Sequence, residues 1–473
     1  MAAPGAKRFD RSIVEGPISG AVWKLAWPTV LQNVIGGLQG VVDHAMVGHY
    51  VGYAGNAAVG VSLQIFIVVI VFVMSLYTGM GVLVARHVGA NDPDRVNHVV
   101  YQAFLATMLL SLVVLAPIGW FAAPWLLDLV RAAPEVKVEA LQYLRISFIG
   151  CAGTLTFFLL GGALRAAGDA KTPLRLGLAM TALNVVLNIL LIRGVGPLPA
   201  LGVAGAALGT VIAAFIVSGI GLWMLLSGRL VVHWPKSQSR RIDWPTVRQL
   251  FAFGLPAGLQ GVAMNVAGVL LLRFIGSLAQ SAEAQAAYAL GYTELFSLVT
   301  WTSVGLMGAA AAVAGQNLGA GKPERSAAAV RVAAGYGVGI AVVVGTLFLT
   351  VPQLLLGLFG MQDPAVLALG GELLRWLAVS GLFISVALTF TGGLQGTGDT
   401  KGPLYISLVS QIAIPLGLLT VLQGLRPLEP SDIWLAILCG HVTRCGLSVW
   451  RFRRGAWRGI AVAPTSEAGS GGE

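Results

Sequence analysis

Asp43 is an ionisable residue inside a long apolar stretch, and such a group is costly to bury and is by default a functional candidate. Pro28, Gln32 and Gln39 precede it, and at 100° per residue the four lie within about 60° of one another around a helix. A helix face that carries this polar stripe must border a cavity or another helix. We expect a cavity, with a hydrogen-bonded seam between helices as the alternative.

Two asparagines could complement this carboxylate. Asn184 and Asn188 are four residues apart and share a helix face, where their amides could hydrogen-bond a carboxylate or coordinate a cation. A polar clamp between helices is the alternative. Pro28 removes a backbone hydrogen bond, and Gly36 lowers the cost of bending. The helix that carries Asp43 can therefore kink, which would couple its shape to the charge of the carboxylate.

The elements that position these residues are predicted to be membrane-spanning helices. Hydrophobic residues form 56% of the 473 residues and charged residues only 11%, where soluble globular chains carry roughly 25%; the mean hydropathy is +0.81. Twelve apolar stretches have about the 20 residues that a helix needs to cross a bilayer core. They are residues 20–46, 59–85, 97–120, 139–163, 173–193, 201–226, 247–275, 287–314, 327–350, 366–392, 403–424 and 433–451.

The composition also excludes other classes of protein. Three cysteines cannot build a disulfide framework, and the net charge of +10 is spread between apolar runs, so a soluble nucleic-acid binder is excluded. With the N-terminus in the cytoplasm, about 22 of the 30 basic residues fall on the cytoplasmic side, as the positive-inside rule requires. We therefore expect a multi-pass protein of the cell (inner or plasma) membrane with both termini cytoplasmic.

An internal repeat relates the two halves of the chain. Residues 162–174 recur as residues 392–404, an offset of 230, with seven of thirteen positions identical. Two collinear echoes pair residues 89–95 with 319–325, and Pro28, Gln32 and Gly48 with Pro256, Gln260 and Gly276. The repeated Gly-Asp-x-Lys-x-Pro is typical of a tight turn in which Gly ends one helix and Asp accepts hydrogen bonds from the start of the next.

The repeat predicts an all-α polytopic fold of twelve transmembrane helices in two homologous six-helix lobes. The predicted parts are a cytoplasmic segment 1–19, an N-lobe 20–226, a cytoplasmic linker 227–246, a C-lobe 247–455 and a disordered cytoplasmic tail 456–473. Because six is an even number, both halves enter the membrane from the same side, so the repeats are parallel. Two such lobes can enclose a cavity and rock about it, which favours a transporter.

The second half offers its own candidates. Gln260 is the repeat equivalent of Gln32, and Asn265 lies nearby on the same span. Glu294 lies in the eighth span, where we expect it to pair with Arg273 across the hairpin; a functional ion site at Glu294 is the alternative. The position equivalent to Asp43 is a leucine, so the sequence places ion handling in the first half. No zinc-binding, paired-cysteine or nucleophile motif is present, and we expect no enzyme activity, cofactor or resident metal.

Together these segments resemble the MATE (multidrug and toxic compound extrusion) family, over about residues 20–450, and within it the DinF-like branch. The resemblance implies efflux of organic, often cationic, compounds in exchange for inward H⁺ or Na⁺. It also implies that Asp43 is the family's first-helix carboxylate, that Pro28 is the proline whose bending follows protonation, and that Asn184 is a family asparagine. Asn188 stands where some members carry Asp, and residues 376–395 contain no acid, so a C-lobe sodium site is not expected.

The expected mechanism is antiport through one carboxylate. Burial disfavours the charged form of Asp43, which would take a proton from the outer side, release a cationic substrate and let the first helix bend. The partners are small organic substrates and membrane lipid, with no nucleic acid, and a monomer is expected. Na⁺ bound at Asp43, Asn184 and Asn188 is one alternative. A lipid or lipid-linked oligosaccharide flippase is another, ranked lower because buried Arg and Lys are nearly absent.

Overall fold

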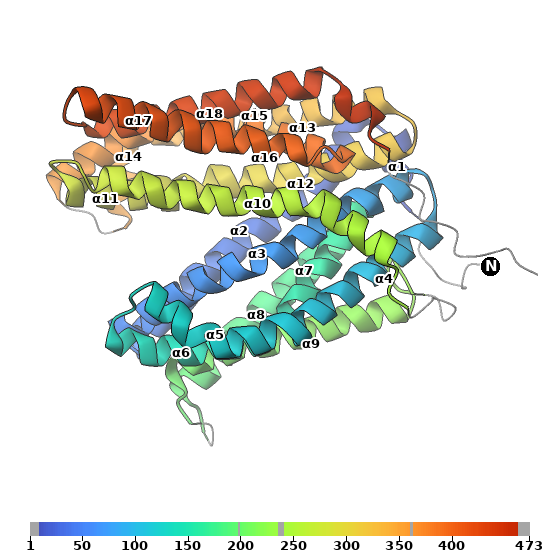
Figure 1. Ribbon diagram of the computed structural model, residues 1–473, viewed down its shortest axis with the longest axis horizontal. Coiled ribbons are helices and arrows are strands. Elements are labelled where there is room, and N and C mark those ends of the chain that lie inside the picture. The colour runs from blue at the N-terminus through green and yellow to red at the C-terminus, as the bar shows by residue number, and fades with distance from the viewer. Residues whose placement is uncertain (1–8, 197–198, 235–240, 360–362, 462–473) are drawn as a thin grey trace, which may run out of the picture. The chain divides into compact units, whose positions relative to one another are not determined.

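The computed structural model describes residues 9–196, 199–234, 241–359 and 363–461, which form helices and no strand (Figure 1). The helices are α1 (Ser12–Glu15), α2 (Ile18–Tyr50), α3 (Tyr53–Gly89), α4 (Pro93–Leu109), η1 (Leu110–Leu115), α5 (Ala116–Leu129), α6 (Pro134–Ile149), α7 (Cys151–Ala166), α8 (Lys171–Arg193), α9 (Gly202–Leu226), α10 (Trp244–Ile275), α11 (Ser281–Tyr288), η2 (Ala289–Leu295), α12 (Ser297–Gly319), α13 (Pro323–Thr350), α14 (Pro352–Gly357), α15 (Pro364–Thr397), α16 (Lys401–Ser407), η3 (Leu408–Ala413), α17 (Ile414–Leu425), α18 (Pro430–Arg453) and η4 (Ala456–Gly459).

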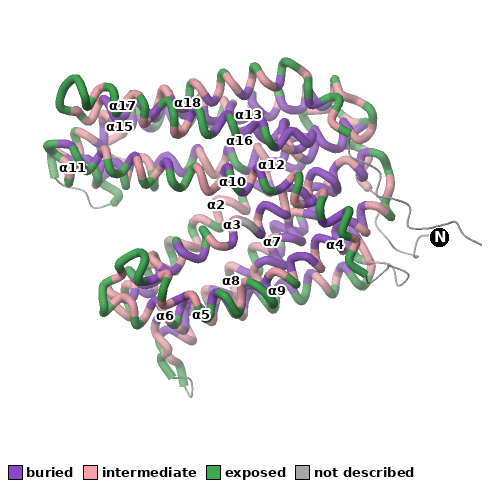
Figure 2. Tube along the Cα trace, viewed as in Figure 1, coloured by how far each residue is buried: buried purple, intermediate pink, exposed green. Residues whose placement is uncertain are grey.

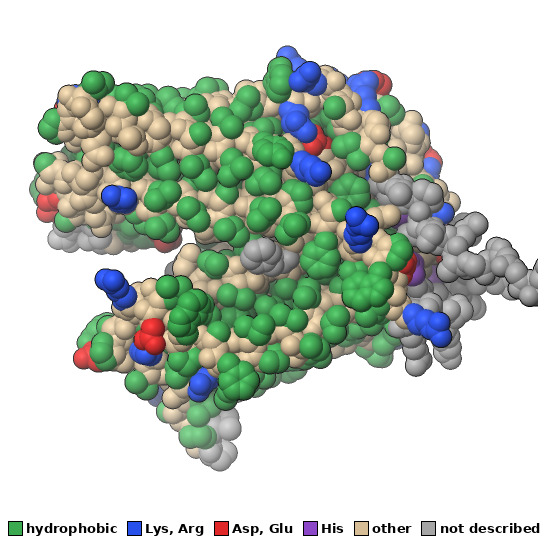
Figure 3. All heavy atoms as spheres, viewed as in Figure 1, with side chains coloured by type: hydrophobic (Ala, Val, Ile, Leu, Met, Phe, Trp, Pro, Cys, Tyr) green, Lys and Arg blue, Asp and Glu red, His purple; other side chains and the backbone are tan. Residues whose placement is uncertain are grey.

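The twelve predicted spans each coincide with one helix or with one run of consecutive helical segments. Within the described residues, ten helices are long and apolar enough to cross a membrane, and the pair α6 and α7, bent by 54°, makes eleven. Exposed residues recur along the helices (Figure 2), and many of the side chains on the visible face are hydrophobic (Figure 3). A surface of this kind suits lipid contact, and the predicted polytopic all-α fold is confirmed.

The repeated turn has the predicted structure in both halves. Gly168 and Gly398 adopt φ angles of 98° and 100°, in the left-handed region that favours glycine. Asp169 and Asp399 each accept a hydrogen bond from the backbone N–H three residues further on, at 3.0 Å. The carboxylates thus satisfy free N–H groups at the starts of α8 and α16.

The chain packs into two compact units whose boundaries differ from the predicted lobes. The first unit holds residues 34–255, and the second holds residues 11–33 and 256–461. Helix α2 passes from the second unit to the first between Asn33 and Val34, and α10 passes from the first to the second at Leu255. The division therefore does not fall at the linker, because the first turns of each repeat pack with the other repeat.

In the first unit, α3 contacts α4, α6 and α7, while α9 contacts α6, α7 and α8. The first turns of α10 join this unit by close backbone contact. A Cβ atom on Gly79 would lie 1.9 Å from the Leu250 carbonyl oxygen, and one on Gly254 would lie 2.1 Å from the Ser75 carbonyl oxygen. Glycine at these positions lets α3 and α10 approach.

The described end of the linker is tied to α4. Gln102 donates from Nε2 to the Arg241 carbonyl and accepts at Oε1 from the Asp243 N–H, both at 2.9 Å. His98 Nε2 lies 2.9 Å from Asp243 Oδ2. Burial raises the pKa of Asp243, but hydrogen bonds from Thr246 and His98 and the charge of His98 outweigh it and hold that pKa below its ordinary value. The linker therefore docks on the first unit before α10 begins.

In the second unit, α15 lies against α12, α13 and α18. Gly392 and Gly396 make the closest approach to α12: Cβ atoms there would lie 2.2 Å and 2.1 Å from the carbonyl oxygens of Met307 and Ala311. This is the small-xxx-small pattern by which helices pack closely in membranes.

Residues 11–33 belong to the second unit through contacts at both of their ends. Lys322 Nζ donates to the Val14 carbonyl at 3.0 Å, and a Cβ atom on Gly305 would lie 2.8 Å from Val30 Cα. The predicted N-terminal segment 1–19 therefore includes an ordered part, α1, although residues 1–8 lie outside the described residues.

The prediction of a disordered tail from residue 456 is wrong for its first six residues. Residues Ala456–Gly459 form the 3₁₀ helix η4. Trp457 is 1% exposed, stacks on Phe452 with ring centroids 4.8 Å apart and donates from Nε1 to the Phe452 carbonyl. A buried aromatic anchor orders this short segment, and the rest of the tail, 462–473, lies outside the described residues.

Candidate functional site

The first unit brings Asp43 and both asparagines together. Asn188 donates from Nδ2 to Asp43 Oδ1 at 2.7 Å and, at 3.3 Å, to Asn184 Oδ1. Both asparagines are fully buried on α8, whereas Asp43 on α2 is partly exposed. The four-residue spacing aligns the two amides, and the carboxylate meets them from the neighbouring helix.

The hydrogen-bonded chain continues into α9. Asn184 donates to Thr210 Oγ1 at 3.0 Å, and Thr210 donates to a backbone carbonyl in its own helix. The Asn188 Oδ1 atom is buried and accepts no hydrogen bond from any residue that the structure describes. A Cβ atom on Gly209 would lie 2.2 Å from that oxygen, so only glycine at this position leaves room for the amide that holds Asp43.

The predicted polar stripe on α2 is divided between the two units. Gln39 lies near Asp43 in the first unit and accepts a hydrogen bond from Thr181 of α8 at 2.7 Å. Gln32 and Pro28 lie in the part of the helix that packs with the second unit. A Cβ atom on Gly36 would meet nothing within 4 Å, so the helix has free space beside its predicted bending region.

Two neighbours of Asp43 were not predicted. His44 Nδ1 lies 2.6 Å from Asn56 Oδ1 of α3, and both His44 and the buried Tyr143 interact electrostatically with Asp43. Adjacency in sequence could have pointed to His44. Tyr143 is more than ninety residues away and lies on α6, so no local pattern could have revealed it.

The candidates in the second unit do not form one site. Gln260 is buried, donates to Ser407 Oγ at 2.8 Å and accepts from Gln395 at 3.1 Å. Asn265 is exposed and donates only to the Gly261 carbonyl, one turn earlier in its own helix. These residues form a polar contact between helices and a cavity-lining amide, respectively.

The expected ion pair between Glu294 and Arg273 is absent from the described residues, and both side chains are exposed. Glu294 lies in η2, a π-helical turn of seven residues. Such a turn shifts the faces of the residues that follow, so the side-chain directions expected for a regular α-helix do not apply.

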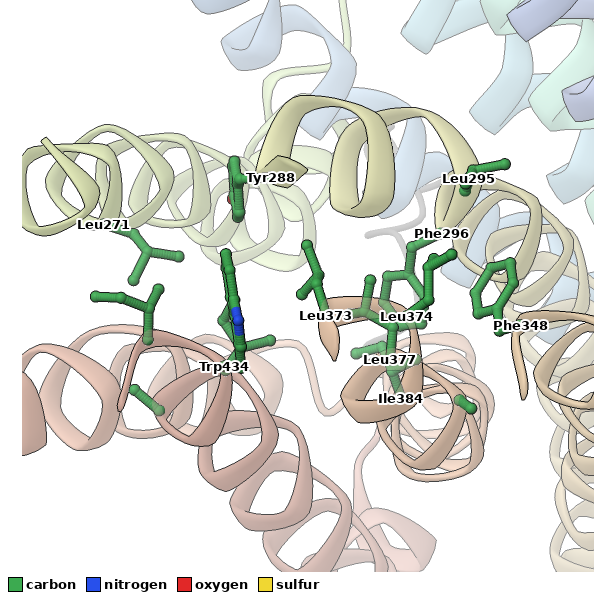
Figure 4. Packing of buried hydrophobic residues seen from close by; sticks show 14 of the residues in the cluster. Leu271, Tyr288, Leu295, Phe296, Phe348, Leu373, Leu374, Leu377, Ile384 and Trp434 are labelled. Atoms are coloured by element: carbon green, nitrogen blue, oxygen red, sulfur yellow. The ribbon is translucent and has the colours of Figure 1, made fainter. Parts of the chain in front are cut away.

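The second unit contains a cavity of about 440 Å³, lined by residues of α10, α11, η2, η3, α17 and α18. Tyr288 and Trp434 belong to the apolar core at this end of the unit (Figure 4). Arg444, 2% exposed, interacts electrostatically with the cavity residues Tyr292 and His441. Arg444 is the only buried Arg or Lys among the described residues, in agreement with the expectation that buried basic residues are nearly absent. Among the described residues, no group of three His, Cys, Asp or Glu could hold a metal ion.

The fold and the site define a polytopic helical membrane protein with one amide-bound carboxylate in its first unit. The MatE family model matches the chain twice, over residues 28–190 and 256–419. The chain belongs to the MatE family. The two matches begin 228 residues apart, at the repeated prolines Pro28 and Pro256.

Relatives and solved structures cover almost the whole chain. It is 25% identical over 447 residues to the "Probable multidrug resistance protein NorM" of Thermotoga maritima, covering 93% of each protein. It is 25% identical to the "Multidrug resistance protein PmpM" of Pseudomonas aeruginosa, covering 92% of this chain and 91% of that protein. The fold is similar to that of a multidrug resistance MATE family transporter in an outward-facing conformation, with a TM-score of 0.86 at 21% identity over 97% and 100% of the two chains.

Proposed function

We propose that this protein is a secondary active efflux transporter that exports organic, mainly cationic and amphipathic, compounds in exchange for inward H⁺. One observation carries the proposal: the hydrogen bond from buried Asn188 to the partly exposed Asp43. Through this hydrogen bond a buried amide positions the ionisable carboxylate of Asp43 among apolar helices. Ionisable residues in such surroundings are typical of ion pathways. The names of the multidrug resistance relatives support the substrate class.

Asp43 is the group at which proton and substrate would compete. As an anion it accepts from Asn188 and attracts an organic cation. A proton taken from the outer side removes the charge, weakens the hold on the cation and favours bending of α2 at Pro28, so that the substrate leaves outward. Loss of the proton to the cytoplasm restores the anion. Each positive charge that moves inward releases about 2.3 kcal/mol per 100 mV.

The amide of Asn188 suits both protonation states of Asp43. In the structure its Nδ2 donates to the carboxylate while its Oδ1 has no partner. Rotation of the amide presents Oδ1 as the acceptor for a protonated carboxyl group. The same free oxygen makes Na⁺ the alternative coupling ion, since carboxylate and amide oxygens are ligands for hard cations.

The test is substrate efflux from proteoliposomes that contain the purified wild-type protein, with a proton gradient and a sodium gradient imposed separately. A proton gradient alone should drive efflux of a fluorescent organic cation such as ethidium. Efflux driven only by sodium would replace H⁺ by Na⁺ as the coupling ion. If neither gradient drives efflux, the antiporter proposal is wrong and the flippase alternative is favoured.

The close contact between Gly209 and Asn188 leads to a first expected result. Gly209→Ala places a methyl group where Asn188 Oδ1 now lies and so displaces the amide from Asp43. Gradient-driven efflux should fall about tenfold, which corresponds to about 1.4 kcal/mol of activation free energy. The matched control is Gly219→Ala on the same helix, where a Cβ atom meets nothing within 4 Å. Equal rates in the two variants would contradict the role given to Asn188.

The proposal includes the finer expectations from the sequence. We place the protein in the inner or plasma membrane as a monomer with cytoplasmic termini, acting on small molecules and not as an enzyme. Assignment to the DinF-like branch stays a prediction.

A further inference from the structure

The cavity of the second unit is lined by neutral polar and apolar residues. None of the described residues that line it is acidic, and its polar groups are mostly hydrogen-bond donors or residues that can donate. Its volume of about 440 Å³ is in the range of pockets for small organic ligands. All the residues that line the cavity belong to the second unit, whereas Asp43, Asn184 and Asn188 belong to the first.

Two of the lining residues keep buried polar atoms without a partner. Gln411 Nε2 and His441 Nδ1 are inaccessible and make no hydrogen bond among the described residues. His441 is 2% exposed, so water does not satisfy its ring from outside. The Gln411 amide nitrogen is a donor, and His441 Nδ1 is a donor in one of the two neutral tautomers of the ring. A buried donor without an acceptor is costly, and a bound ligand is one source of the missing acceptor.

The positively charged Arg444 lies next to the residues that line the cavity but is not itself one of them. Arg444 lies one turn beyond His441 on α18, is 2% exposed and forms no ion pair among the described residues. Its Nε atom also makes no hydrogen bond. The guanidinium interacts electrostatically with Tyr292 and His441, both of which line the cavity. A buried guanidinium stays charged and therefore needs a compensating negative charge.

The aromatic residues of the wall form a stack suited to a flat ligand. The rings of Tyr288 and Tyr292 are parallel with centroids 5.0 Å apart, and His441 follows nearly parallel at 6.4 Å from Tyr292. Tyr292 and Gln411 lie in the π-helical turns η2 and η3. Turns of this kind are frequent at functional sites, and here they bring a ring and an amide to one cavity.

We propose that this cavity binds an aromatic organic anion, with its ring stacking beside Tyr288 and Tyr292 and its carboxylate lying against Gln411 and His441, whose side chains rotate toward the cavity to donate hydrogen bonds to it. Arg444 does not line the cavity and acts as a positioning charge that compensates the anion through the wall. The site goes beyond the proposed export of cations: binding needs no gradient, so its failure leaves the antiport proposal intact, and the reverse also holds.

The test compares three probes of one shape by isothermal titration calorimetry on the purified full-length protein in detergent. 1-Naphthoate should bind at least about tenfold more tightly than the neutral 1-naphthamide and the cationic 1-naphthylmethylammonium. Gln411→Leu removes a donor without removing the charge and should weaken naphthoate binding more than naphthamide binding. Arg444→Gln should abolish the preference for the anion. The control Arg273→Gln, an exposed cation of α10, should keep it.

A cavity-filling variant locates the binding. Gly268 lines the cavity and a Cβ atom there meets nothing within 4 Å, so Gly268→Leu should fill the space and remove naphthoate binding without unfolding the protein. The inference is overturned if the three probes bind equally, if the cation binds most tightly, or if naphthoate binding survives in Gly268→Leu. If Arg444→Gln does not fold, Gln411→Leu and Gly268→Leu still decide the outcome.

Discussion

Asp43→Asn should reduce proton-driven efflux to the rate of protein-free liposomes. The change removes the only charge of the α2–α8 site while the amide oxygen can still accept the hydrogen bond that Asn188 now gives to the carboxylate. The local structure should therefore persist, whereas the group that exchanges a proton and attracts a cation is lost. The measurement is ethidium efflux from proteoliposomes after an imposed pH jump, with the folded fraction followed by size-exclusion chromatography and thermal unfolding.

The control for this experiment is a carboxylate of the same unit that the mechanism does not use. Asp128 ends α5, is exposed and pairs with Lys137. Asp128→Asn should leave the efflux rate unchanged. Wild-type efflux in a well-folded Asp43→Asn protein would show that another group carries the proton, and His44, which interacts electrostatically with Asp43, would be the next residue to test.

Gly392→Ala and Gly396→Ala should each destabilise the protein by about 1–3 kcal/mol. At both positions the new methyl group would meet a carbonyl oxygen of α12 at 2.2 Å or less, and backbone atoms cannot move aside as a flexible side chain can. Helix α15 contacts α12, α13 and α18, so a displaced α15 disturbs much of the second unit. The shift is measured as the change in the midpoint of thermal unfolding in detergent.

A third glycine provides a control with the opposite expected sign. Gly335 is an exposed position of α13 where a Cβ atom meets nothing within 4 Å. Since alanine favours the helix by up to about 1 kcal/mol over glycine, Gly335→Ala should leave the midpoint unchanged or raise it. If all three variants raised the midpoint, the close packing of α15 on α12 would not be what these glycines provide.

Hydropathy and the internal repeat were enough to predict the helical fold, because both signals are local or periodic. The turns at Gly168 and Gly398 followed from the same logic, since left-handed glycine and a capping aspartate act over a few residues. Helical spacing also placed Asn184 and Asn188 on one face. That this face meets Asp43 was a hypothesis from residue types, and the structure shows the contact.

Features that depend on tertiary packing could not be predicted from the sequence. The π-helical turn η2 changes the direction of Glu294, and nothing in an apolar run marks where such a turn occurs. The cavity beside Arg444 is assembled from four separate stretches of chain, namely α10, α11 with η2, η3 with α17, and α18, so no single span predicts it. The spacing of Gly392 and Gly396 is visible in the sequence and is typical of close helix packing. Only the structure shows that these glycines pack against the backbone of α12.

The passage of α2 and α10 between the compact units has a consequence for the origin of the chain. Each unit is completed by the opening turns of the other repeat, so an isolated six-helix half lacks a packed segment. A single ancestral half could have completed itself only by accepting that segment from a second copy, as a segment-swapped dimer. Duplication with fusion turns that concentration-dependent association into an intramolecular one with a high effective concentration. The linker then needs only to connect the end of the first repeat to the start of the second. Its contacts with Gln102 and His98 of α4 fix the end of the linker that leads into α10.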